Sequence, residues 1–133
     1  VQHIHDRVEP ALKEGKIVIC DRYIDSSFAY QAYARGLGFD FIADINSYAV
    51  KNYLPDLTIF IDLSPEEAFS RKHGADENDR MEQAGANFHA RVYEGYKKLL
   101  KEYPDRIRAV DGRKTPNEVF EEILSALKEK CCL

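Results

Sequence analysis

Apolar and polar positions follow two different periods along the chain. Short apolar runs at 16–20, 57–63 and 106–110 predict three β-strands. The run at 16–20 ends in four successive apolar residues, as is typical of a parallel sheet covered on both faces. Segments with apolar residues three and four positions apart separate these runs and predict helices. Because strands that alternate with helices favour parallel pairing through right-handed crossovers, the pattern predicts an α/β fold around a parallel sheet.

The helices predicted in the first half of the chain have recognisable end signals. Gly15 is expected to end the first helix, and Pro10 is expected to kink or weaken it. Asp25 and Asp40 are predicted N-caps of the two helices that follow. The predicted ranges are 1–14, 25–34 and 41–53, the last with Ile42, Ile45 and Ala49 facing inward.

Two capping boxes predict where later helices begin. Ser64 and Glu67 form one box, with Pro65 at the first helical position, and Thr115 and Glu118 form the other. The apolar face expected after the second box comprises Val119, Phe120, Ile123, Leu124 and Leu127. The remaining predicted elements are a helix over 86–102 and a mobile, polar loop over 72–85.

Length and composition narrow the class of protein. A chain of 133 residues, of which 44% are hydrophobic, is expected to form a single domain with its own core. Its net charge of −4 argues against a protein that binds nucleic acid duplexes, although it is compatible with a local basic pocket. The sequence has neither an apolar run of transmembrane length nor a signal-peptide pattern, so a cytoplasmic protein without membrane association is expected. The three cysteines form neither a disulfide framework nor a zinc-ligand spacing.

The strongest candidate chemistry follows the first apolar run. Asp21 and Arg22 come directly after this run, which places a forked cation at the carboxyl end of a predicted strand, where open α/β sheets bind ligands. A guanidinium there suits a phosphate group. Ser27 and Gln31 lie on one face of the next predicted helix, and a hydroxyl and an amide at that spacing suit a flat polar base. The segment therefore indicates a nucleotide site.

Several short motifs occur in an order that resembles bacterial thymidylate kinases over nearly the whole chain. The motifs are Asp21-Arg22-Tyr23, Ser26-Ser27, Tyr30-Gln31, Ala34-Arg35-Gly36, Pro55-Asp56-Leu57-Thr58 and Asp79-Arg80-Met81-Glu82-Gln83. The resemblance implies a three-layer P-loop kinase-like fold with a parallel sheet and a lid at about 72–85. It also implies transfer of the γ-phosphoryl group of ATP to dTMP, which gives dTDP for dTTP synthesis, with Mg²⁺ as the cofactor.

The resemblance assigns a role to each residue of the acceptor-nucleotide site. Arg22 is expected to hold the acceptor phosphate. Asp21 is expected to orient Arg22 and to lie near water bound to Mg²⁺, without coordinating the metal directly. Tyr23 is expected to pack near the deoxyribose and to reject a 2′-hydroxyl. Ser27 and Gln31 are expected to contact the thymine edge, since a glutamine amide supplies both the donor and the acceptor that thymine requires.

Other implied positions stay open. Tyr30 is either a substrate-binding residue or a residue that packs on the sheet. Arg80 and Arg71 are both candidates for the catalytic lid arginine, a residue worth roughly 10³ or more in rate. Arg80 is the first choice because it lies within a matching motif. The residues expected to contact the base of ATP are Asp111, Gly112 and Arg113.

The sequence departs from the family at the phosphate-binding loop. The only Gly-Lys pair is Gly15-Lys16, which precedes a predicted strand and lacks the P-loop spacing. The resemblance places the P-loop strand between the runs at 16–20 and 57–63, so the sheet is expected to be incomplete, without its first strands and P-loop. We expect residues 1–133 to be a single partial domain, the C-terminal two-thirds of a thymidylate kinase. Such a chain should be poorly stable or self-associating, and inactive alone.

A second hypothesis comes from another class of protein. The chain could serve as a non-catalytic nucleotide-binding or interaction module that retains only the dTMP acceptor site. Binding of dTMP without binding of ATP would favour this hypothesis. The expected partners are dTMP, ATP and a second copy of the chain, with the helix over 41–53 as the candidate dimer contact.

Overall fold

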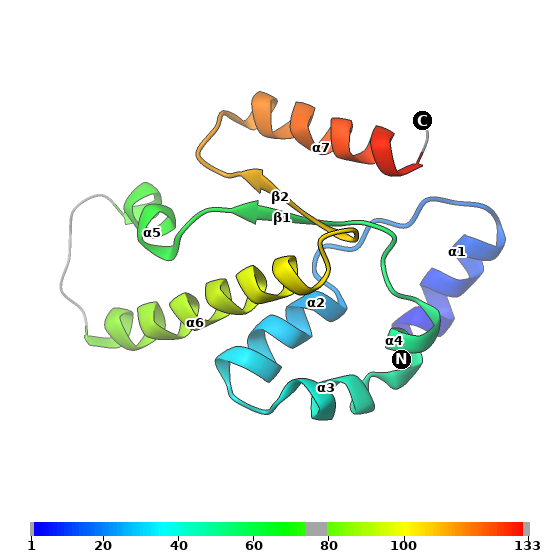
Figure 1. The fold of residues 1–133 in the computed structure, drawn as a ribbon, viewed down its shortest axis with the longest axis horizontal. Coiled ribbons are helices and arrows are strands. Elements are labelled where there is room, and N and C mark those ends of the chain that lie inside the picture. Colours follow the sequence, from blue (N-terminus) through cyan, green and yellow to red (C-terminus); the bar gives the residue numbers. More distant parts are fainter. Residues whose placement is uncertain (1, 74–79, 132–133) are drawn as a thin grey trace. The chain divides into compact units, whose positions relative to one another are not determined.

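The computed structural model describes residues 2–73 and 80–131, and its contacts divide the chain into two compact units, Val1–Leu54 and Pro55–Leu133. The described residues of the first unit form helices and connecting segments, and those of the second unit form a sheet with helices (Figure 1). None of the helices in these ranges combines the length and the hydropathy that a bilayer span requires.

Short helical segments of two kinds form the first unit. The first helix begins with π-type hydrogen bonding and continues with α-type bonding next to Pro10, which has no N–H to donate. Proline therefore changes the pairing without ending the helix. The helix predicted over 1–14 is confirmed, and Gly15 follows it in the left-handed conformation with φ +72°. The elements of this unit are η1 (Ile4–Val8), α1 (Glu9–Lys13), α2 (Ile24–Ser27), η2 (Phe28–Ala34), α3 (Phe39–Ile45) and α4 (Ser47–Asn52), where η denotes a π-helix.

Apolar side chains from both ends of the first unit form its core. Ile4, Val8 and Ala49 cluster together and are 3%, 7% and 4% exposed. A second contact stacks the rings of Phe28 and Phe39, whose centroids lie 4.3 Å apart. The half-buried residues packed on the first cluster are Val18, Tyr23 and Tyr53. Packing of Tyr23 fixes the start of the segment that carries the candidate chemistry.

The strand predicted over 16–20 is wrong. This segment has no regular secondary structure, and it pairs with no strand in the described part of the chain. Ile17 and Ile19 are 77% and 90% exposed. An apolar run records only a preference for burial, whereas a strand also needs a neighbour for its N–H and C=O groups.

Both N-caps predicted in the first unit are wrong. Asp25 lies inside α2, is 3% exposed and does not cap the helix. Asp40 lies in the first turn of α3, and Gly38 takes the cap position with φ +85°. The helix starts two residues earlier than the cap signal indicates, and Phe39, its first residue, stacks on Phe28.

The third predicted helix is two helices. α3 ends at Ile45 and α4 begins at Ser47, with Asn46 at the break, where its side-chain Nδ2 donates to the carbonyl oxygen of Ile42 at 2.9 Å. Of the residues expected to face inward, Ile42 and Ala49 are buried but Ile45 is 58% exposed. The break interrupts the helical period, so the three residues do not share one buried face.

A pair of parallel strands forms the centre of the second unit. β1 (Thr58–Asp62) pairs with β2 (Ile107–Asp111), and Phe60 lies opposite Ala109. This confirms two of the three predicted strands and their parallel pairing. The helices of the unit are α5 (Pro65–His73), α6 (Arg80–Glu102) and α7 (Pro116–Cys131). Figure 1 shows α6 and α7 on opposite sides of the strand pair, the layering that right-handed crossovers produce.

The loop predicted over 72–85 is wrong at both ends. α5 continues through His73, and α6 begins at Arg80. Residues 74–79 of the predicted lid lie outside the described residues. The polar composition of this stretch indicates exposure to solvent, but glutamate, glutamine, arginine and methionine are also good helix formers. The helix predicted over 86–102 is therefore confirmed but starts earlier.

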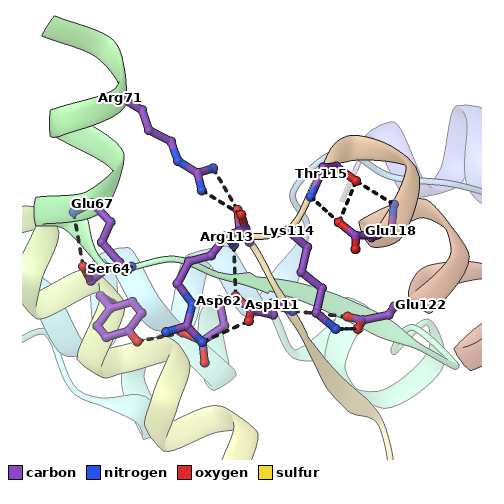
Figure 2. Close-up of polar contacts among 12 residues, drawn as sticks. Asp62, Ser64, Glu67, Arg71, Asp111, Arg113, Lys114, Thr115, Glu118 and Glu122 are labelled. Atoms are coloured by element: carbon purple, nitrogen blue, oxygen red, sulfur yellow. Dashed lines mark hydrogen bonds and ion pairs between the residues drawn. The ribbon is translucent and has the colours of Figure 1, made fainter. Parts of the chain in front are cut away.

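Both capping boxes in the second unit are confirmed. The Ser64 N–H donates to Glu67 Oε2 at 3.1 Å, and the Glu67 N–H donates to Ser64 Oγ at 3.2 Å. Thr115 and Glu118 exchange the equivalent bonds at 2.9 and 3.4 Å (Figure 2). Phe120, expected on the buried face of α7, is 59% exposed, so the prediction for this residue is wrong.

Candidate nucleotide-binding site

Arg22 has an unusual backbone and an accessible side chain. Its φ of +67° makes it the one non-glycine residue with a left-handed φ in the described ranges, a conformation that costs about 1–3 kcal/mol. The side chain is exposed, and its guanidinium carbon lies 4.3 Å from the centroid of the Tyr30 ring. Among the described residues it forms no ion pair, so its N–H donors are available to a ligand.

Two buried polar atoms after Arg22 in the sequence have no hydrogen-bond partner among the described residues. The hydroxyl of Tyr23 and Oε1 of Gln31 are inaccessible to solvent, and no described group hydrogen-bonds to either atom. Burial, assisted by the nearby Cys20 thiol, raises the pKa of the Tyr23 hydroxyl. A buried polar atom without a partner costs about 1–3 kcal/mol and requires an explanation. A bound ligand that donates to Gln31 would supply one.

These residues belong to one continuous segment, 21–31, which we call the acceptor segment. Ser27 ends α2, and Tyr30 and Gln31 lie in η2, where the Arg35 N–H donates to the Tyr30 carbonyl at 3.1 Å across five residues. π-Helical turns of this kind are frequent at functional sites. The segment combines a free cation, a hydroxyl and an amide, which together suit a phosphate and a polar base.

A second cluster of charged groups lies in the other unit, in the loop at 111–115 after β2. The Asp111 carboxylate accepts hydrogen bonds from Nε and Nη2 of Arg113 at 2.8 and 2.9 Å and from its backbone N–H at 3.0 Å (Figure 2). These bonds lower the pKa of Asp111 to about 2. The charge of Arg113 is thus matched within its own loop.

The same loop is held against α5 and β1. Arg71 of α5 donates from Nη1 to the Gly112 carbonyl at 2.8 Å and from Nη2 to the Arg113 carbonyl at 3.2 Å (Figure 2). A Cβ at Gly112 would lie 2.9 Å from Cγ2 of Ile61 and 3.0 Å from Cβ of Leu63, so only glycine fits there. The backbone of this loop therefore has a fixed position within the second unit.

A cavity of ≈ 210 Å³ opens beside this loop at the carboxyl ends of the strands. Asp62 accepts hydrogen bonds from the Tyr93 hydroxyl and from Lys97 Nζ, both at 2.7 Å. Burial alone would raise the pKa of Asp62, but these two bonds and the charge of Lys97 lower it below its usual value. The residues that line the cavity are Asp62, Ser64, Glu67, Tyr93, Ala109, Val110, Asp111 and Arg113. Three of these eight residues are acidic and one, Arg113, is basic with its charge matched by Asp111, so the lining does not favour a phosphate group.

Comparison with known proteins identifies the family. The sequence profile described as "Thymidylate kinase" matches residues 1–123. The chain belongs to the thymidylate kinase family. It is 48% identical over 129 residues to the thymidylate kinase of Clostridium novyi and 43% identical over 130 residues to that of Bacillus velezensis. Each comparison covers 96% of this chain, but only 63% and 61% of the relative. The chain therefore spans about three fifths of the length of these thymidylate kinases.

A solved thymidylate kinase confirms the predicted fold. The crystal structure of thymidylate kinase from Ehrlichia chaffeensis matches with a TM-score of 0.72 and 30% sequence identity, over 96% of this chain and 57% of that protein. The predicted α/β class and the kinase-like fold with a parallel sheet are thus confirmed. The recognition of the family from the short motifs of the sequence is confirmed by the same comparisons.

The structure distributes the predicted site residues of this thymidylate kinase chain over its two units. In the first unit, Arg22 contacts Tyr30, while Asp21 is exposed and Ser27 is half-buried. In the second unit, Arg71 and the loop at 111–115 form one connected cluster. α6 begins at Arg80, but the side chain of that residue lies outside the description.

The sequence analysis missed the network around Asp62. The sequence did offer a signal for this network. Asp62 ends an apolar run, and Tyr93 and Lys97 lie four residues apart on one face of a predicted helix. The signal is weak because it does not show which strand the helix face meets.

The acceptor segment fits only a loose contact to a metal. In the described ranges no group of three or more histidine, cysteine or acidic side chains could hold a metal ion. Asp21 offers one exposed carboxylate. Mg²⁺ in kinases keeps several waters and takes most other ligands from phosphates, so a single carboxylate suits contact through water.

Proposed function

We propose that this chain carries the acceptor site of a thymidylate kinase, which transfers the γ-phosphoryl group of ATP to dTMP and gives dTDP for dTTP synthesis. The observation that carries the proposal is the acceptor segment, where an exposed guanidinium without an ion pair precedes a buried amide oxygen without a partner. Membership of the thymidylate kinase family supports the same function.

Each residue of the acceptor segment has a distinct task in this proposal. Arg22 donates to the phosphate of dTMP, and Asp21, which forms no ion pair with Arg22 among the described residues, contacts metal-bound water. Ser27 and Gln31 contact thymine, whose ring N–H donor matches the unpartnered Oε1 of Gln31. Tyr23 packs against the deoxyribose. Satisfying the buried oxygen of Gln31 adds to the affinity because the free protein carries the cost of leaving it unpaired.

Phosphoryl transfer to a phosphate oxygen asks the protein for position and positive charge more than for proton transfer. Mg²⁺, when bound with ATP, neutralises the charge on the phosphates. Arg80 is the favoured lid arginine, because the donors of Arg71 already bind two backbone carbonyls of the second unit. We propose that the base of ATP lies against the loop residues Asp111, Gly112 and Arg113.

The absence of a P-loop from the 133 residues bears on the activity of this chain. We propose that the chain alone binds dTMP but does not transfer a phosphoryl group. The second candidate function is a non-catalytic module that retains the acceptor site. The two functions differ in whether turnover appears when a P-loop segment is supplied.

We also propose that the chain forms a homodimer through α3 and α4. Phe41 and Ile45 are 54% and 58% exposed, and Tyr48 is 37% exposed. Apolar side chains concentrated on two short helices suit a contact between copies. Sedimentation of the chain and of Ile45→Lys tests this, and an unchanged monomer fraction in the variant would contradict it.

Calorimetric titration of the 133-residue chain tests the proposed function. We expect dTMP to bind, ATP to show no comparable binding, and no dTDP to form when both are present with Mg²⁺. Addition of a P-loop segment from a related thymidylate kinase should restore turnover if the enzyme hypothesis is correct. Failure of dTMP to bind would overturn the acceptor site, and formation of dTDP by the chain alone would overturn the proposed inactivity.

A further inference from the structure

Two unusual features meet at Arg22. Its backbone is left-handed, a conformation that non-glycine residues adopt rarely and that is concentrated at functional sites. Its guanidinium lies over the face of the Tyr30 ring at 4.3 Å, and the structure gives it no other charged or hydrogen-bonding partner within the described ranges. A ring face is therefore the group that determines where this cation lies.

Stacking on a ring leaves the hydrogen-bonding capacity of an arginine intact. The guanidinium is planar, and its five N–H donors point outward in that plane, so a contact through the flat face uses none of them. Arg113 shows the opposite arrangement, since Nε and Nη2 are both occupied by Asp111. The contact with Tyr30 restricts the long side chain of Arg22 without consuming the donors that a phosphate needs.

We propose that Tyr30 is a positioning residue that holds the Arg22 guanidinium, through the face of its ring, in the orientation that binds the acceptor phosphate. This inference rests on the proposed function and deepens it. The position of the ring is itself defined by η2, where the Tyr30 carbonyl accepts from the Arg35 N–H in the π-helical pattern. Tyr30 thereby acts on the phosphate through Arg22, not through its own hydroxyl.

A double-mutant cycle on the 133-residue chain tests this role, with dTMP and thymidine as the two probes. Tyr30→Leu should weaken dTMP binding about fivefold, the size expected for a cation–π contact at a partly exposed site, and should change thymidine binding less than about twofold. Tyr30→Phe is the matched control, because it keeps the ring and should retain the affinity for dTMP. In the Arg22→Ala background, Tyr30→Leu should have no further effect on dTMP binding.

A spectroscopic measurement keeps the test independent of the folding of the leucine variant. The Nε–H proton of Arg22 should resonate upfield of exposed arginines in wild-type chain and in Tyr30→Phe, because the guanidinium carbon next to Nε lies 4.3 Å from the centroid of the aromatic ring. Arg22→Lys assigns the signal by its loss. A signal at the position of an ordinary exposed arginine would overturn the stacking.

The outcomes separate this inference from the proposed function. If wild-type chain fails to bind dTMP, the proposed function fails. If it binds dTMP but the effects of Arg22→Ala and Tyr30→Leu add, the positioning role of Tyr30 is overturned and the acceptor site stands. An equal loss of dTMP affinity in Tyr30→Phe would also overturn the role, because it would transfer the effect to the hydroxyl.

Discussion

Two arginines of the molecule differ in what surrounds them. Arg113, in the loop after β2, has its charge matched by Asp111 through two side-chain hydrogen bonds, and the backbone around it is fixed by Arg71. Arg22, in the acceptor segment, contacts only a ring face within the described residues, and the same segment buries two atoms without hydrogen-bond partners. An internally satisfied cluster stabilises the fold that contains it. A segment with unpartnered polar atoms carries a free-energy cost, and a ligand that hydrogen-bonds to those atoms can remove it.

The largest expected effect is on dTMP binding, when the guanidinium of Arg22 is removed. Arg22→Ala should weaken dTMP binding by about 2–3 kcal/mol, or roughly 30- to 150-fold, because it removes charge-assisted bonds to the phosphate. Thymidine, which lacks the phosphate, should bind nearly as before. Arg108→Ala is a matched control, since Arg108 is 55% exposed and its ion pair with Glu129 is long, at 3.7 Å. Equal losses of affinity for dTMP and for thymidine in calorimetry would refute the assignment of Arg22.

The strained backbone at Arg22 allows a loss of binding to be separated from a loss of folding. Arg22→Gly removes the guanidinium and places at φ +67° the residue that adopts this conformation most readily. The variant should bind dTMP as poorly as Arg22→Ala, while its free energy of unfolding rises by about 1 kcal/mol. Urea denaturation measures the second quantity, and a clearly less stable glycine variant would show that the side chain supports the fold.

In the second unit, removing a charge that already has hydrogen-bond partners should lower the stability of the fold. Asp62→Asn removes the charge that binds Tyr93 and Lys97 and should lower the free energy of unfolding by about 2 kcal/mol. Because folding lowers the pKa of Asp62, its contribution is present above the pKa of the unfolded chain, near 4, and is lost as the pH falls through the folded value. Denaturation between pH 7 and pH 2.5 should therefore show a smaller loss in the variant. Asp105→Asn, at an exposed site, should follow wild type, and an acid profile unchanged by Asp62→Asn would exclude this network.

Unlike the change at Asp62, a change at the buried amide of Gln31 should weaken nucleotide binding without lowering stability. Gln31→Met keeps the approximate size but removes the unpartnered oxygen, so the free energy of unfolding should stay constant or rise by about 1 kcal/mol. Binding of thymidine and of dTMP should both weaken by about 1–2 kcal/mol, since the lost contact is to the base. Tyr23→Phe removes the other unpartnered atom and should also preserve stability. A destabilised methionine variant would indicate that Gln31 serves the fold.

The smallest effect, on the free energy of unfolding, is expected at a helix cap of the second unit. Ser64→Ala removes the acceptor of the Glu67 N–H and should lower the free energy of unfolding by about 1 kcal/mol, without a change in dTMP binding. Ser125→Ala, on the exposed surface of α7, is the control and should change neither quantity. Identical stabilities for the two variants would show that the Ser64 cap does not stabilise the fold.

Local chemistry made some of these features predictable from the sequence. A capping box needs only residues three positions apart, and both predicted boxes form. β1 and β2 were predictable because each apolar run has the other as its neighbour. The run at 16–20 has the same pattern, but the pattern does not record whether a pairing strand is present. Asp40 failed as a cap because a contact between distant rings, Phe28 and Phe39, determined where α3 begins.

The candidate site was predictable in its membership but not in its geometry. The motif around Arg22 and Gln31 is local and identified the family. The left-handed backbone of Arg22, its stack on Tyr30 and the buried state of Gln31 Oε1 depend on how η2 packs, which the residue order does not encode directly. The bonds of Arg71 to the loop at 111–115 join residues 41 and 42 positions apart, so no local motif could predict them.

The most direct test of the central claim is the difference in affinity between dTMP and thymidine for the unmodified 133-residue chain. If the unpaired guanidinium of Arg22 binds the acceptor phosphate, dTMP should bind at least about tenfold more tightly than thymidine at low salt, and the difference should shrink as salt is added. Equal affinities of dTMP and thymidine at every ionic strength would contradict the account.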